Sequence, residues 1–226
     1  MNGIALAHLL RLASPGLPVG AFSYSQGLEW AVEAGDVRDE HSAGDWIGAL
    51  LASNMTRFEL PLLVRLHRAW NADDSDAVGK WNTLFRASRE TAELRAETLQ
   101  MGAALKAALA ASGEFNSAQT AKLDSIDAVT FPAAFAFAAQ AWAILPGHCA
   151  LGYAWSWAES QVTAAMKLVP LGQSAGQRIL ARLTPEMANA VETALTLEDD
   201  DLSNFAPLYA IASSRHETQY TRLFRS

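Results

Sequence analysis

The chain has 226 residues, half of them hydrophobic, and carries a net charge of −7 at neutral pH. This length suits one domain, or at most two small ones, with a core that needs no disulfides or metals. The acidic balance argues against a nucleic-acid partner. Without a secretory start or a long uncharged apolar run, we expect a soluble cytoplasmic protein with no membrane contact.

Helical periodicity dominates the first half of the chain, and no segment alternates as a strand would. A short helix is predicted over residues 4–13 and ends at Ser14-Pro15. Ser23 and Gln26 stand three apart, as in a capping box, and predict the start of the next helix. Further helices are predicted over residues 43–56, 59–70, 73–85 and 86–111.

The last of these helices carries two pairs of opposite charge at i,i+4 spacing, Arg86–Glu90 and Arg89–Glu93. Such pairs are typical of the solvent-exposed side of a helix. Glu93 and Glu97 lie on one helix face, and nothing in the sequence distinguishes them from ordinary solvated acids.

The second half begins with the most linker-like stretch, residues 112–125, and then returns to helical periodicity. Thr184-Pro185-Glu186 predicts a helix start, with Thr184 as the N-cap and Pro185 at the first helical position. Helices are predicted over residues 131–145, 148–169 and 172–183, from residue 185 onward, and over 204–214. The whole chain, residues 1–226, is therefore expected to form a single all-α domain of about ten helices.

A search for catalytic motifs finds none that is complete. The phosphate-binding G-x-x-x-x-G-K-[ST] loop and the G-x-S-x-G serine elbow are both absent. His216-Glu217 begins like the zinc motif H-E-x-x-H, but Tyr220 stands where the second histidine belongs. Cys149 is the only cysteine, and we interpret it as a small buried thiol. No catalytic, cofactor or metal residue is predicted.

Three segments are too specific for packing alone: residues 14–29, 153–177 and 213–226. In the second, Lys167 lies in an apolar stretch, where it must reach water or meet an acidic partner. The third ends in a tail at about residues 215–226, where three arginines are interleaved with apolar side chains. We expect this tail to be poorly ordered alone and to order against a partner. Its folding back onto the chain's own acidic surface is the alternative.

These segments, together with Arg89-Glu-Thr91 and Phe131-Pro132, resemble the urease accessory protein F family. The resemblance implies an all-helical, dimeric protein that is not an enzyme and needs no cofactor. It implies binding to accessory protein D, called H in some organisms, and to the GTPase accessory protein G, in an assembly that delivers nickel to apo-urease. The opposing hypothesis is a metal-dependent enzyme whose site combines residues distant in sequence.

The residues expected to bind partners lie in the three segments. They are Tyr24, Glu29, Lys167, Arg215, His216, Glu217, Tyr220, Arg222, Leu223, Phe224 and Arg225. Arg and aromatic side chains are the types enriched where proteins bind each other. The tail is expected to dock onto protein D or H, and Lys167 is expected to face the GTPase.

Overall fold

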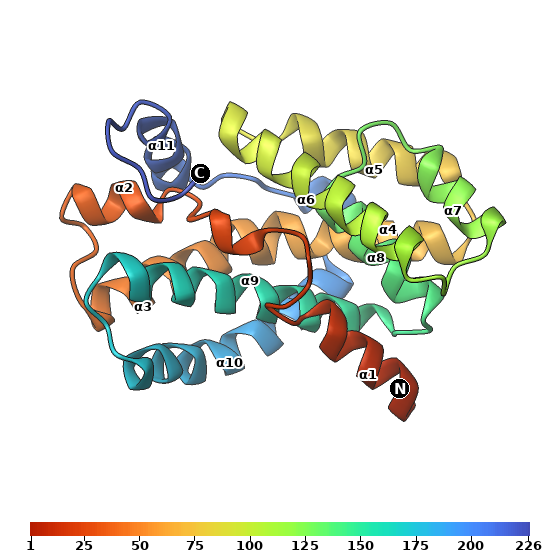
Figure 1. The fold of residues 1–226 in the computed structure, drawn as a ribbon, viewed down its shortest axis with the longest axis horizontal. Coiled ribbons are helices and arrows are strands. Elements are labelled where there is room, and N and C mark those ends of the chain that lie inside the picture. The colour runs from red at the N-terminus through yellow and green to blue at the C-terminus, as the bar shows by residue number, and fades with distance from the viewer.

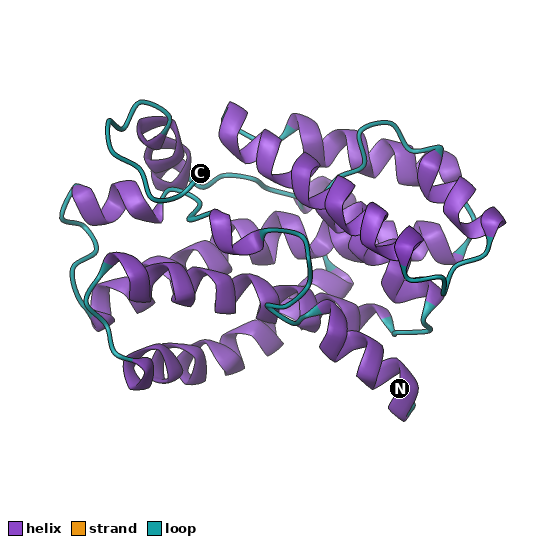
Figure 2. Cartoon of the chain, viewed as in Figure 1, coloured by secondary structure: helices purple, strands orange, loops and turns teal.

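The computed structural model describes residues 1–226, and it confirms the predicted all-α architecture (Figure 2). The helices are α1 (Gly3–Leu12), α2 (Leu28–Glu33), α3 (Glu40–Leu50), α4 (Leu60–Asn71), α5 (Ser75–Ala87), α6 (Ala92–Ala111), α7 (Ser117–Asp124), α8 (Phe131–Ala141), α9 (Pro146–Leu168), α10 (Gln173–Thr196) and α11 (Pro207–His216). None of them is long and apolar enough to span a lipid bilayer.

The core forms where α4, α8, α9 and α10 pack together. Every residue from Phe131 to Ala139 of α8 is buried, and most of these are alanine or phenylalanine. Alanines let neighbouring helices approach closely, while Phe135 stacks edge-on against Tyr153, with ring centroids 5.3 Å apart. Gly102 of α6 also allows a close approach, because an added Cβ would lie 2.2 Å from the Val129 carbonyl oxygen.

The two ends of the chain lie on opposite sides of this core (Figure 1). The first helix, α1, packs on α9, whereas α11 packs beside α2. Gly27 makes the second contact possible. It adopts a φ of +79°, and a Cβ there would lie 3.0 Å from the side chain of Ala212 and from the backbone nitrogen of Ser213.

Two predicted boundaries are wrong because helices continue through them. A π-helical segment, Leu51–Glu59, joins α3 to α4. Likewise, α10 runs unbroken through Pro185. The proline lies on the exposed side of α10, so the Ala181 carbonyl that receives no hydrogen bond from it can bind water. The Thr184 hydroxyl donates to the Leu180 carbonyl at 2.8 Å instead of capping a new helix.

Three other expectations are wrong because helices begin at residues other than the predicted ones. The predicted helix over residues 86–111 breaks after α5, and α6 starts only after Thr91, whose side chain accepts from the Leu94 amide. Residues 112–125 contain α7, which has a capping box between Asn116 and Gln119. The Ser23–Gln26 capping box does not form, since α2 begins after Gly27.

The break before α6 also rearranges the predicted surface ion pairs. Arg89 is buried and its Nη1 lies 2.7 Å from Glu59 Oε1, not beside Glu93. Arg86 pairs with Asp127 at 3.3 Å rather than with Glu90. Neither i,i+4 pair exists, because the residues involved lie on two different helices and the bend between them.

Candidate functional site

The C-terminal tail, residues 215–226, is ordered against the chain's own surface. It lies along α2 and the start of α6, close to α11 (Figure 1). The structure differs from the expectation of a free tail and follows the alternative, in which the tail folds back onto the chain's own acidic surface. The reason is a set of three carboxylates, Glu29, Glu93 and Glu97, which hold the tail by directed hydrogen bonds. We call this surface the tail dock.

Glu29 on α2 binds the backbone of the tail. Its two oxygens accept from the Leu223 amide at 2.6 Å and the Phe224 amide at 2.9 Å. Ser25, just before α2, donates from its amide and its hydroxyl to the Ser226 carbonyl, each at 2.6 Å. Backbone groups of the tail thus find the partners that a buried segment requires.

His216 is completely buried between two carboxylates. Its Nδ1 lies 2.6 Å from Glu93 Oε2, and its Nε2 lies 3.2 Å from Glu29 Oε2. Each ring nitrogen therefore has a carboxylate oxygen within hydrogen-bonding distance. Arg222 also contacts Glu93, and Glu217 accepts from the Glu93 amide at 3.1 Å. A carboxylate at this first turn of α6 is favoured by the helix dipole.

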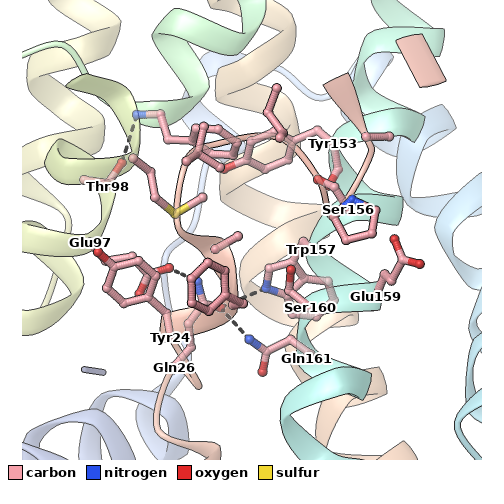
Figure 3. Close-up of a pocket in the computed structure, with 18 of the residues that line it drawn as sticks. Tyr24, Gln26, Glu97, Thr98, Tyr153, Ser156, Trp157, Glu159, Ser160 and Gln161 are labelled. Carbon is pink, nitrogen blue, oxygen red and sulfur yellow. Dashed lines mark hydrogen bonds between the residues drawn. The ribbon is translucent and has the colours of Figure 1, made fainter. Parts of the chain in front are cut away.

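Glu97 joins the end of the tail to the protein interior, where it lies beside Gln26 (Figure 3). It accepts from the Ser226 hydroxyl at 2.7 Å and from Gln26 Nε2 at 2.6 Å. The Gln26 carbonyl oxygen in turn accepts from Trp157 Nε1 at 2.8 Å. Burial raises the pKa of Glu97 to about 7, although the hydrogen bonds from Ser226 and Gln26 oppose the shift.

Two further candidates, Lys167 and Tyr24, lie beside residues of the tail. The exposed Lys167 places its Nζ 5.6 Å from the centre of the buried Phe224 ring. Tyr24 donates to Gln100 Oε1 at 2.9 Å, and Arg225 reaches the same oxygen at 3.4 Å. Burial raises the pKa of Tyr24, and the neighbouring Arg225 opposes that shift.

Other tail residues point away from the dock. Tyr220 is fully exposed, and Leu223 is 65% exposed. Arg215 is also exposed. On the adjoining α11 and the residues before it, Phe205, Leu208 and Ile211 are more than half exposed. The tail therefore binds the protein with one side and presents apolar and basic side chains on the other.

The sequence analysis missed the acids of the dock. Glu93 and Glu97 are not solvated, since Glu97 is 7% exposed and Glu93 receives His216 and Arg222. A signal was present in the tail, where three arginines stand against one glutamate. Such a basic segment in an acidic chain indicates that carboxylates elsewhere in the chain pair with it. Only the folded backbone shows that residues 93 and 97 are the ones within reach.

No site for catalysis is evident in the same region. No group of three or more His, Cys, Asp or Glu side chains is placed to hold a metal ion. Cys149 is buried, as predicted, and burial raises the pKa of its thiol well above the usual range. The arrangement is that of an all-helical protein whose C-terminal tail lies on its own acidic surface.

Comparison with known proteins identifies the family to which this helical protein belongs. Residues 37–184 match the model of the UreF family. The chain is 53% identical over 225 residues to the urease accessory protein UreF of Azoarcus sp. strain BH72, covering 99% of this chain and 96% of that protein. It is 49% identical over 222 residues to the protein of the same name from Methylobacillus flagellatus, covering 98% of each. The chain belongs to the UreF family of urease accessory proteins.

Proposed function

We propose that this protein is a non-catalytic scaffold in urease maturation. It binds accessory protein D (or H) and the GTPase accessory protein G in the cytoplasm, and the assembly delivers nickel to apo-urease. Family membership and relatives named urease accessory proteins support the maturation role. The scaffold role rests on the observation that follows.

The two-sided tail carries the proposal. Its inner side is fixed by Glu29, Glu93 and Glu97, so its outer side is presented in one arrangement. That outer side exposes Leu223 at 65%, and the adjoining α11 exposes Leu208 at 72% and Ile211 at 51%. Exposed apolar groups gathered beside arginines are typical of protein interfaces. A preorganised surface also loses less conformational entropy when it binds, which favours affinity. We assign protein D or H to this surface.

Lys167 supports a second contact on the same side of the molecule. Its charged end is exposed and has no carboxylate partner, although it lies over the Phe224 ring. An acidic group of the GTPase partner would supply the missing counter-charge. The proposal also includes a homodimer, supported by other exposed apolar side chains on α1, Ile4 at 73% and Leu10 at 64%.

The decisive experiment is a pull-down with the matching D and G proteins, followed by a urease activation assay. Deleting residues 221–226 should abolish capture of protein D and urease activation while leaving a folded dimer. Because the deletion also opens the dock, the double variant Tyr220→Ser/Leu223→Ser provides a second test that leaves the inner contacts intact. It should weaken capture at least tenfold.

The matched control is Leu145→Ser, which removes a 52% exposed apolar side chain just before α9, outside both proposed surfaces. It should leave capture of protein D unchanged. Full activation by the truncated chain, or equal losses in the control and the double variant, would contradict the assignment.

The enzyme hypothesis is tested on the protein alone. We expect no GTP hydrolysis, and no stoichiometric nickel site tighter than about 1 µM, which corresponds to roughly −8 kcal/mol. Calorimetric titration of the tag-free protein measures the second quantity. A tight site would show that distant ligands converge and would favour the metal-dependent alternative.

A further inference from the structure

An apolar cavity of about 410 Å³ lies between α6, α7 and the segments that flank α7. It is at the end of the molecule away from the C-terminal tail (Figure 1). Small-molecule sites commonly have volumes of roughly 300–1,000 Å³, so this space suits a small ligand. Its inner wall consists of buried or half-buried apolar side chains, Leu109, Phe115, Leu123, Ile126, Val129 and Phe137. None of them belongs to the partner surfaces proposed above.

The space exists because α7 covers α6 without packing closely on it. Leu123 is the only residue of α7 that is buried. On the facing side, α6 contributes Ala103 and Ala107, whose short side chains line the cavity and are exposed to solvent. An ion pair between Lys106 and Asp124, at 2.7 Å, joins the two helices at the rim. The cavity is therefore open along α6 and closed on its inner side by larger apolar groups.

Two aromatic rings belong to this wall. Phe115 lies in the loop before α7, and the centre of its ring is 5.6 Å from that of Phe137 on α8. The Phe115 ring is also 5.4 Å from the ring of Trp142, so it is held in position by two neighbours. Aromatic pairs are favoured at these separations beyond the area that they bury. A flat aromatic ligand can therefore add a further ring to an arrangement that is already fixed.

The polar side chains at the cavity limit the charge of the ligand. Lys106 and Asp124 pair with each other, so the rim presents no net charge. The Thr120 hydroxyl donates to the carbonyls of Asn116 and Ser117, at 3.3 and 3.1 Å, within its own helix end. A charged ligand would have to break the ion pair to find a counter-ion, and it would lose hydration on entering an apolar space. The rim therefore favours a ligand without charge.

We propose that the cavity between α6 and α7 binds a small, uncharged molecule built on apolar aromatic rings. The ligand lies against Phe115 and Phe137 and removes the apolar wall from water, which is the main source of its affinity. Because it contacts both α6 and α7, it stabilises the position of α7. This inference goes beyond the proposed scaffold role and does not depend on it, since its tests require no partner protein.

The test uses two fluorescent probes on the full-length protein. N-phenyl-1-naphthylamine is uncharged, and 8-anilinonaphthalene-1-sulfonate has the same ring system with an added sulfonate. We expect one saturable site per chain for the uncharged probe, with half-saturation at roughly 10–100 µM, as the usual affinity per atom indicates for a ligand of this size. The sulfonate should bind at least tenfold more weakly. Equal affinities would overturn the assignment of an uncharged ligand, and the absence of saturable binding would overturn the site.

A pair of variants locates the bound probe. Ala107→Phe fills the cavity with a ring and should weaken binding of N-phenyl-1-naphthylamine at least tenfold. Ala121→Phe is the matched control, because Ala121 is exposed on α7 and does not line the cavity. It should bind the probe as the unmodified protein does. Equal binding by the two variants would place the probe on another apolar surface and overturn the proposal. If Ala107→Phe does not fold, methyl NMR of the unmodified protein decides, since the probe should shift the Ala103 and Leu123 methyl resonances and unmoved resonances would overturn the proposal.

Discussion

The buried residues of helix α8 and those of the C-terminal tail are held in place by different physical means. In α8 every side chain from Phe131 to Ala139 is enclosed by other helices. In the tail only His216, Phe224 and Ser226 are buried, and exposed residues alternate with them. Burial of α8 is stabilised by apolar area removed from water, whereas the tail is held by hydrogen bonds to three carboxylates.

This difference indicates that the tail can detach while the core of the protein stays folded. Apolar packing is shared among many neighbours, so α8 cannot leave without the whole core unfolding. The tail makes few apolar contacts. Its attachment depends on charge and on a small number of hydrogen-bond acceptors. Release of the tail is thus a local event. A partner that competes for the dock would act on the tail and leave the core intact.

Breaking the core should have the largest effect on stability. Phe135→Ala removes a fully buried ring that stacks on Phe131 and Tyr153. We expect the free energy of unfolding to fall by about 3–5 kcal/mol. Urea unfolding followed by circular dichroism measures this. Phe22→Ala, at a 68% exposed position, is the control and should cost under about 0.5 kcal/mol. Similar losses in the two variants would show that packing does not dominate.

The next effect concerns the acid that joins the tail to the interior. The folded pKa of Glu97, about 7, lies above the usual glutamate value of 4.5. Between these values the folded protein binds more protons than the unfolded chain. This group therefore makes the free energy of unfolding decrease as pH rises through this window, by up to about 3 kcal/mol.

Glu97→Gln should remove that pH dependence, so stability changes less between pH 4.5 and pH 7 than in the unmodified protein. Urea unfolding at a series of pH values measures the slope. The control is Glu40→Gln, because the Arg178 hydrogen bond lowers the pKa of Glu40 and its titration lies below this window. An unchanged slope in Glu97→Gln would contradict the assignment of the raised pKa.

A smaller effect is expected when the dock alone is weakened. Glu29→Gln keeps the shape of the side chain but removes the charge that accepts from the Leu223 and Phe224 amides. Charge-assisted hydrogen bonds contribute about 1.5–3 kcal/mol, so local opening of the tail should become at least tenfold more frequent. Hydrogen exchange at these two amides measures it. Amides within α8 should keep their protection from exchange. An equal loss of protection in α8 would show that the tail and α8 open as one cooperative unit.

The same contrast explains what the sequence could predict. Helix periodicity identified α8 and α9 because long apolar faces repeat at a fixed spacing, and this signal is local. It failed at Pro185, where packing of the flanking turns sustains one helix, and at Thr91, where no glycine or proline marks the break. Local pattern also could not show that Arg89 faces Glu59, thirty residues away along the chain.

For the candidate site, the segments were found but their contacts were not. The composition of the tail predicted a binding element, and the resemblance included Tyr24, Glu29 and Lys167. Hydrogen bonds between residues 194 and 195 positions apart, those from Leu223 and Phe224 to Glu29, depend on the folded path of the chain. The dock is therefore a product of the fold and not of any one segment.

The smallest effect on stability, and the sharpest test of the outer surface, comes from Lys167. Its only described interaction is with the Phe224 ring at 5.6 Å, and an exposed cation–π contact contributes about 0.5–1 kcal/mol. Lys167→Ala should leave the melting temperature nearly unchanged and weaken capture of the GTPase. Lys80→Ala is a matched control, because Lys80 is exposed and lies 4.1 Å from the centre of the Trp81 ring. It should show the same small change in stability with capture intact. Calorimetry and pull-down together separate the outcomes, since a much lower melting temperature would make Lys167 a structural residue of the dock. Equal capture by both variants would remove it from the GTPase surface.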